Sequence, residues 1–326
     1  MASNTKIEWC DMTINPVVGC TKCSDGCRSC YAERFAARMA KHPNPKISGK
    51  YAGVVDENGK WTGNFNVDLT PFASLPKKSK RIFIGSMCDI FHENASYNWF
   101  LWIVRRMSQY PQHTFILLTK RPQRMNKFIS LTRETDTDCG LWPLPNLWLG
   151  VTVCNQAEAD EKIPSLLQTP AAVRFVSVEP CLGPVDLGHL SWTDIIGSTA
   201  EKNALTGKTW IQGNCGESSQ TLQGNRLDWV ICGGETGPGA RPMHPDWVRG
   251  LRDQCQAAAT PFFFKGWGEL VTENQSPEDI VLPGHSTIPH GWKGRKYEDS
   301  VYRVGKRRAG RLLDGREWNE VPEVKA

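Results

Sequence analysis

Short, continuously apolar runs recur along the chain, each followed by a polar turn. Strands buried on both faces of a parallel sheet have this pattern, whereas half-exposed strands alternate between apolar and polar positions. Residues 13–19 are consistent with a first strand, although Pro16 restricts it to an edge or a strand end. The pattern therefore predicts buried parallel strands, and the runs are residues 81–87, 113–119, 147–153, 174–180, 228–234 and 261–267.

Amphipathic stretches between these runs predict helices. They cover residues 30–41, 97–109, 121–131, 159–168 and 244–258. Strands that alternate with helices indicate an α/β fold with a parallel sheet. Six or seven such units suit a partial or complete TIM-like parallel βα barrel. An open dinucleotide-binding sheet is less consistent, because no Gly-x-Gly-x-x-Gly follows the first strand.

Two segments interrupt the alternation of strands and helices. Residues 188–225 form a polar insertion, which is either a lid or a small β excursion because long structureless loops are uncommon in compact domains. Residues 270–326 are charged and rich in Gly and Pro, and we expect them to pack on the barrel as a C-terminal extension. No clear boundary divides the remainder, so a single barrel domain over 1–326 is expected.

Composition and charge limit the compartment in which the protein is expected and the partners it is expected to bind. No apolar run approaches the roughly 18 residues of a membrane span, and the N-terminus lacks the basic-then-apolar order of a signal peptide. We therefore expect a cytoplasmic protein with no membrane partner. The net charge of +5 is mild, but local basic runs at 119–127 and 305–311 favour a nucleic-acid partner. The expected phosphate contacts are Arg124, Lys127, Lys306, Arg307 and Arg308.

Polar side chains follow the predicted strands at their carboxyl ends. In a βα barrel these ends meet on one face, which carries the chemistry. Charged groups there must be solvated or paired, so one shared polar pocket is the simplest account. The residues at these ends are Ser86, Asp89, Thr119, Lys120, Arg121, Cys154, Asn155, Glu179, Gly233, Gly234, Glu235 and Lys265.

Four of the twelve cysteines, Cys20, Cys23, Cys27 and Cys30, lie within eleven residues. In a reducing compartment such spacing favours a metal over disulfides. A zinc site usually separates its two pairs by a dozen or more residues, whereas iron–sulfur clusters tolerate tight runs. If three thiolates bind a [4Fe-4S] cluster, the open iron can hold S-adenosylmethionine (SAM) and pass it an electron. Cys23-x3-Cys27-x2-Cys30 has this spacing.

Several blocks resemble a radical-SAM-like bacteriophage protein family. They include the cysteine segment, "VSVEPCLGP", "WVICGGETGPGARPMHPDWVRGLRDQC", "PFFFKGWGE" and "VGKRRAGRLLDGREW". The resemblance implies a [4Fe-4S] cluster, SAM as cofactor, and Cys20 rather than Cys23 as the third ligand. The family usually has glutamate where this chain has Cys154, which makes Cys154 a candidate hydrogen-atom donor.

The resemblance also suggests roles for the charged groups at the strand ends. Glu179 or Glu235 would meet the SAM amino group, with Gly233 and Gly234 beside it. Lys120, Arg121 or Lys265 would meet its carboxylate. Glu179 and Lys265 are additionally candidates for catalysis, together with Cys154.

The implied substrate is a nucleic-acid base, which an enzyme must flip out of the stack to reach. Family context favours the modification or rearrangement of hypermodified thymine in phage DNA, with an electron donor such as flavodoxin or ferredoxin. Two related alternatives remain, a DNA photoproduct lyase and an RNA-base modifier. A different class is also open, a zinc-stabilised protein that binds nucleic acid without catalysis.

Overall fold

The structure, a computed structural model, describes residues 2–5, 7–72, 75–135, 142–193, 199–212, 220–272, 275 and 300–323. Within these ranges, every helix is too short or too polar to span a bilayer.

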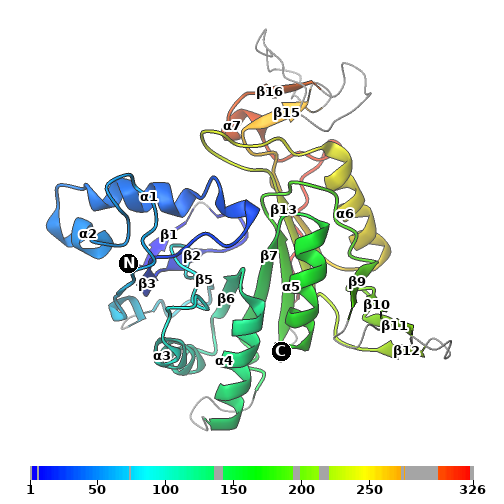
Figure 1. Cartoon of the computed structure of the whole chain (residues 1–326), viewed down its shortest axis with the longest axis horizontal. Coiled ribbons are helices and arrows are strands. Elements are labelled where there is room, and N and C mark those ends of the chain that lie inside the picture. The colour runs from blue at the N-terminus through cyan, green and yellow to red at the C-terminus, as the bar shows by residue number, and fades with distance from the viewer. Residues whose placement is uncertain are drawn as a thin grey trace. The chain divides into compact units, whose positions relative to one another are not determined.

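The largest sheet has eight strands in the order β1-β2-β5-β6-β7-β8-β13-β14 (Figure 1). The pairs β2–β5, β5–β6, β6–β7 and β13–β14 are parallel, whereas β1 is antiparallel to β2. The predicted α/β fold with a large parallel sheet is therefore confirmed. The strands are β1 Ala2–Asn4, β2 Met12–Ile14, β5 Arg81–Ile84, β6 Thr114–Thr119, β7 Leu147–Val153, β8 Val173–Val178, β13 Trp229–Gly233 and β14 Phe262–Gly266.

The continuously apolar runs became strands because both of their faces are covered. All seven residues of β7 and all five of β13 are buried. Pro16 divides the first run as its missing N–H requires. Before it lies β2; after it, β3 (Val17–Val18) leaves the large sheet and pairs with β4 (Asn66–Val67).

Helices occupy the predicted stretches. Ser96 begins α3 by accepting a hydrogen bond from the Asn98 backbone N–H at 3.2 Å, and His244 does the same for α6 through the Asp246 N–H at 3.1 Å. The helices are α1 Tyr31–Ala40, α2 Pro45–Ser48, α3 Tyr97–Ser108, α4 Pro122–Thr135, α5 Gln156–Gln168, α6 Pro245–Ala257 and α7 Lys306–Ala309. Short 3-10 turns are η1 Asp25–Cys27, η2 Gly49–Tyr51 and η3 Thr70–Phe72.

The chain divides into two compact units. Unit 1 comprises Met1–Thr152 and Pro164–Phe175, and unit 2 comprises Val153–Ile163 and Val176–Ala326. In unit 1, α3 and α4 pack through rings of Phe91, Phe100 and Phe128 whose centroids lie 5.3 to 5.9 Å apart. The expectation of one barrel domain over 1–326 stays a prediction.

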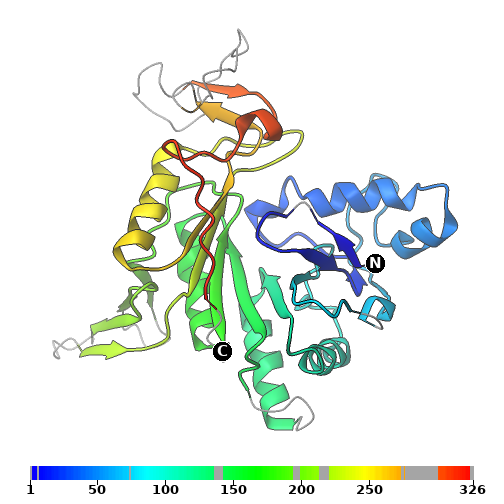
Figure 2. The ribbon, with the colours of Figure 1, turned by 180° about the vertical axis from the view of Figure 1, so that it is seen from behind.

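In unit 2, the C-terminal segment runs along β14 (Figure 2). The Phe264 N–H donates to the Trp318 carbonyl at 2.9 Å, and the Glu320 N–H donates to the Phe262 carbonyl at 3.2 Å. This part of the expected extension covers the outer edge of the strand. β15 (Leu270–Thr272) and β16 (Val301–Arg303) form a two-stranded sheet, and residues 276–299 of the extension lie outside the described residues.

The insertion contains a small antiparallel sheet of four strands. Their order is β12-β11-β10-β9, from β9 Leu190–Thr193, β10 Thr199–Lys202, β11 Lys208–Gln212 and β12 Gln220–Gln223. The region is thus a β excursion of unit 2. Residues 194–198 and 213–219 lie outside the described residues, and a function as a lid stays a prediction.

Candidate functional site

The four clustered cysteines lie on one loop of unit 1, between β3 and α1. Gly19 begins the loop with φ +128°, and a Cβ there would lie 2.1 Å from the Asn64 carbonyl oxygen, so only glycine fits. Ser24 accepts a hydrogen bond from the Gly26 N–H at 3.1 Å and starts η1. Tyr31 opens α1 directly after Cys30. The cysteines are therefore presented by a defined turn.

The thiols of this loop interact with one another. Cys23 donates a hydrogen bond to Cys27, which lowers the pKa of Cys27 to about 5 and raises that of Cys23. Burial and then the Asp89 carboxylate raise the pKa of Cys20 to about 12, with contributions from Cys30 and Cys27. Cys20 therefore interacts electrostatically with Cys27 and Cys30, the two cysteines that the candidate triads share.

Within the part of the chain that the structure describes, no three or more His, Cys, Asp or Glu side chains are grouped so as to hold a metal ion. Thiolates are the usual ligands of a [4Fe-4S] cluster, and the four free cysteines of this loop supply that type of donor. A cluster on the loop stays a prediction.

Asp89, in the turn that follows β5, organises the polar groups beside this loop. Its carboxylate accepts hydrogen bonds from the Thr119 hydroxyl at 2.7 Å and from the Lys120 backbone N–H at 3.1 Å. It also pairs with the Arg121 guanidinium at 3.1 Å, and both side chains are less than a tenth exposed. The ends of β5 and β6 are thereby tied together.

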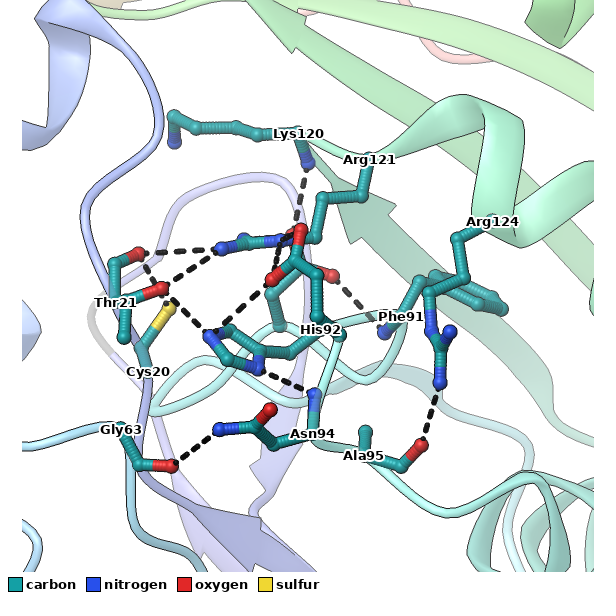
Figure 3. Close-up of polar contacts among 12 residues, drawn as sticks. Cys20, Thr21, Gly63, Phe91, His92, Asn94, Ala95, Lys120, Arg121 and Arg124 are labelled. Atoms are coloured by element: carbon teal, nitrogen blue, oxygen red, sulfur yellow. Dashed lines mark hydrogen bonds and ion pairs between the residues drawn. The ribbon is translucent and has the colours of Figure 1, made fainter.

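Arg121 connects this pair to the cysteine loop (Figure 3). Its terminal nitrogen donates to the Thr21 hydroxyl at 3.1 Å and to the Thr21 carbonyl at 3.5 Å, while its Nε donates to Glu93 at 2.8 Å. His92 contacts the same Thr21 hydroxyl at 2.6 Å, and burial lowers the pKa of His92. Two side chains thus hold the residue that follows Cys20.

Lys120 lies close enough to the loop for its charge to act on Cys27. It helps to lower the pKa of that thiol, after the hydrogen bond from Cys23. Lys120 and Arg121 were both predicted to bind the SAM carboxylate. Arg121 uses its donors on Asp89, Glu93 and Thr21. SAM binding by either residue stays a prediction.

The predicted nucleic-acid residues of α4 differ in their surroundings. The Arg124 guanidinium donates to the Ala95 carbonyl at 2.9 Å and lies 4.7 Å from the centre of the Phe128 ring. It therefore packs within unit 1, whereas Lys127 is exposed. Lys306, Arg307 and Arg308 are all exposed on α7 of unit 2. Their nucleic-acid contacts stay predictions.

In unit 2, two of the predicted catalytic residues, one directly after β8 and one in β14, meet across β13. The Lys265 Nζ lies 2.5 Å from the Glu179 carboxylate, and each side chain is about one-fifth exposed. A Cβ on Gly233 would lie 3.2 Å from that of Lys265 and 3.7 Å from Glu179. Gly233 therefore leaves room for the pair.

Glu235 and Gly234 have structural partners of their own. The Glu235 carboxylate, 5% exposed, accepts hydrogen bonds from the Arg241 backbone N–H and guanidinium at 2.7 to 2.9 Å. A Cβ on Gly234 would lie 2.0 Å from the Trp267 carbonyl oxygen, which explains the glycine by close packing. A role for either residue in SAM binding stays a prediction.

Cys154 is fully buried directly after β7. Its backbone N–H donates to the Glu158 carboxylate at 3.1 Å, and its carbonyl accepts from the Leu182 N–H at 2.8 Å. These contacts fix its backbone at the start of unit 2. Cys154 thus lies at the end of a strand, as the sequence predicts. Its role as a hydrogen-atom donor stays a prediction.

Sequence reasoning missed several residues next to the cysteine loop. Thr21, His92 and Glu93 carry no motif, and only their contacts with Arg121 reveal them. Cys88 forms a β-bridge with Gly19 and interacts electrostatically with Cys20. The available signal was the presence of Asp89, His92 and Glu93 shortly after an apolar strand.

A family described as a protein of unknown function (DUF5131) matches residues 4–322, so the chain belongs to that family. No curated protein and no solved structure matches the chain. The family match extends across both compact units.

Proposed function

We propose that this protein is a radical SAM enzyme that holds a [4Fe-4S] cluster on the cysteine loop and acts on a nucleic-acid base. The observation that carries the proposal is the gathering of interacting thiols on one loop, beside the positive charge of Lys120. When bound, such a cluster supplies an open iron for SAM and the electron that cleaves it.

Cys20, Cys27 and Cys30 are the proposed ligands. Cys20 interacts electrostatically with the other two, whereas the exposed Cys23 is engaged as a hydrogen-bond donor to Cys27. In the protein without metal, Cys23 therefore stabilises the Cys27 thiolate, the form that binds iron. Arg121 and His92 hold Thr21 and so fix the position of Cys20.

The charged groups divide into two roles. Lys120 offers the cation for the SAM carboxylate, because its charge already acts on the loop. For the SAM amino group, the candidate carboxylate is Glu179 of unit 2, which the sequence resemblance alone suggests. It is preferred over Glu235, whose oxygens accept three hydrogen bonds from Arg241. Lys265 pairs with Glu179 and would orient its carboxylate until SAM binds.

The finer proposals rest on the family resemblance in the sequence. They are a TIM-like radical SAM barrel, Cys154 as hydrogen-atom donor, hypermodified thymine in phage DNA as substrate, and flavodoxin or ferredoxin as electron donor. A parallel sheet with polar strand ends supports the barrel.

The test is anaerobic reconstitution with iron and sulfide, followed by metal analysis and incubation with SAM, dithionite and DNA. About four irons per chain, formation of 5′-deoxyadenosine and a mass change in the DNA nucleosides are the expected results. Zinc alone, with no SAM cleavage, would instead indicate a nucleic-acid-binding protein without catalysis. Turnover of RNA, or reversal of a thymine photoproduct, would redirect the substrate assignment.

A further inference from the structure

Helix α1 presents an aromatic and basic surface to solvent on the side opposite its core contacts. Ala32 and Ala36 face inward and pack in a cluster with Val18, Tyr51 and Val54. The outward positions follow the spacing i, i+3, i+4 and i+7 that marks one face of a helix. This α1 face consists of Tyr31, Arg34, Phe35 and Arg38.

Two aromatic rings on this face are exposed but held in place. Tyr31 is 51% exposed, and its hydroxyl donates to the Ser86 carbonyl at 2.6 Å. Phe35 is 37% exposed, and it meets the edge of the Tyr51 ring at 6.2 Å. Ordering these rings in advance lowers the entropic cost of binding a flat partner.

The charge around the rings is positive. Residues 22–46 contain six Lys or Arg and two Asp or Glu, a net charge of +4, compared with +5 for the whole chain. One of the two acids, Glu33, is buried and paired with Lys22 and Lys60. Arg38 lies 5.1 Å from the centre of the Phe35 ring, which combines a cation with a stacking surface.

We propose that the α1 face binds a single-stranded segment of nucleic acid, with bases on Tyr31 and Phe35 and phosphates on Arg34 and Arg38. Exposed rings joined to a basic surface are the means by which proteins bind single strands without sequence preference. Four residues of helix advance about 6 Å, a spacing suited to unstacked rather than duplex bases at about 3.4 Å.

The position of α1 next to the cysteine loop suggests a function for the α1 face. Tyr31 directly follows Cys30, so a strand on the α1 face begins beside the proposed cluster loop (Figure 1). The inference rests on the proposed function, because a nucleic acid is the substrate there. It adds that the strand around the target base is held unpaired by unit 1.

The test compares variants of the full chain, reconstituted and without SAM, in fluorescence anisotropy with a labelled 20-nucleotide strand and with its duplex. Tyr31→Leu and Phe35→Leu are each expected to weaken single-strand binding about 5- to 100-fold, with a smaller effect on duplex. Tyr31→Phe keeps the ring and should retain most of the affinity. Arg38→Gln should reduce the log–log salt slope by about 0.7.

Two exposed residues of unit 1 supply matched controls. Trp102 on α3 is 38% exposed, and Arg133 lies on the exposed face of α4. Trp102→Leu should leave single-strand affinity unchanged, and Arg133→Gln should leave the salt slope unchanged. Deoxyribose and ribose strands of the same sequence distinguish DNA from RNA as the source.

The possible outcomes distinguish a failure of the α1 face as a binding surface from a failure of the proposed enzyme activity. Equal affinity of wild type, Tyr31→Leu and Phe35→Leu would overturn the assignment. Normal strand binding with slowed reduction by flavodoxin would overturn it in favour of an electron-donor surface. Loss of strand binding in these variants, in a protein that never cleaves SAM, would retain the surface and refute the radical enzyme.

Discussion

The guanidinium of Arg121 donates hydrogen bonds to both the hydroxyl and the carbonyl oxygen of Thr21, a residue one hundred positions earlier in the chain. Thr21 directly follows Cys20. The turn after β6 is thereby bonded to the cysteine loop, while the same arginine is paired with the buried carboxylate of Asp89. Arg121 is a positioning residue for the loop.

Replacement of Arg121 should therefore impair metal loading as well as folding. Arg121→Ala leaves Asp89 buried without its cation and is expected to cost about 3–5 kcal/mol of stability. It also releases Thr21, so iron retention after gel filtration with a chelator should fall several-fold. Thermal unfolding and iron analysis measure the two effects separately.

Arg106 on α3 provides the control. Its guanidinium donates to the Phe72 carbonyl, Gln109 and Tyr110, all of which belong to unit 1 and none of which lies in the cysteine loop. Arg106→Ala should lower the melting temperature and leave iron retention unchanged per folded chain. Equal iron loss in both variants would assign the effect to general instability.

The strands could be predicted from sequence because their local pattern reflects their burial. β7 and β13 read as continuous apolar runs, and both are covered on both faces. Pro16 likewise marked the point where the first run leaves the large sheet. Such features depend on a few neighbouring residues.

The site contacts could not be predicted, because their partners are distant in sequence. Nothing near Arg121 indicates that Asp89, Glu93 and Thr21 would consume its donors, so it was considered for SAM binding. Glycine at 234 could equally have served a ligand, and only the Trp267 carbonyl shows why no side chain fits. The type of residue at a strand end suggests a chemical role. Whether the residue can take that role depends on the side chains and backbone atoms that contact it in the fold.

The two glycines after β13 should respond differently to a methyl group. In Gly234→Ala the new Cβ meets the Trp267 carbonyl oxygen at 2.0 Å, so the backbone must move and about 1–3 kcal/mol of stability should be lost. In Gly233→Ala the nearest atom, the Lys265 Cβ, is at 3.2 Å, and stability should change far less. Denaturant unfolding of both variants measures the difference, and equal losses would refute the packing explanation.

Glu179 and Lys265 should affect SAM binding through their pairing. Glu179→Gln removes the carboxylate proposed for the SAM amino group, so calorimetry with reconstituted protein should give more than tenfold weaker binding. Glu317→Gln is the control, since Glu317 lies 3.8 Å from the Arg311 guanidinium in the C-terminal segment of unit 2. Unchanged SAM affinity in Glu179→Gln would remove Glu179 from the site.

Asp314 should make the stability of unit 2 depend on acid pH. Hydrogen bonds from Arg249 and then Arg252 lower the pKa of Asp314 in the folded chain. A lowered folded pKa stabilises the protein above the unfolded value of about 3.9, and this contribution is lost as pH falls through the folded pKa. The side chain is over a third exposed, so we expect about 1 kcal/mol or less at pH 7.

Asp314→Asn isolates that effect. Asn tolerates the positive φ of 51° at this position, so the backbone is retained while the charge is removed. The variant should melt below wild type at pH 7, and the two should converge at pH 2–3. A difference that persists at pH 2 would mean that the carboxylate charge is not responsible.

The choice of the third cysteine ligand can be decided by four single replacements. Cys27→Ala and Cys30→Ala should abolish the visible absorbance of the cluster and SAM cleavage, because both residues belong to either triad. Cys20→Ala should do the same, since Cys20 interacts electrostatically with both. Cys23→Ala should retain most of the cluster.

Cys23→Ala should also raise the pKa of Cys27 in the metal-free protein, because the hydrogen bond that lowers this pKa is lost. Anaerobic absorbance and thiol alkylation against pH measure both effects, and a cluster that survives without Cys20 but not without Cys23 would reverse the assignment.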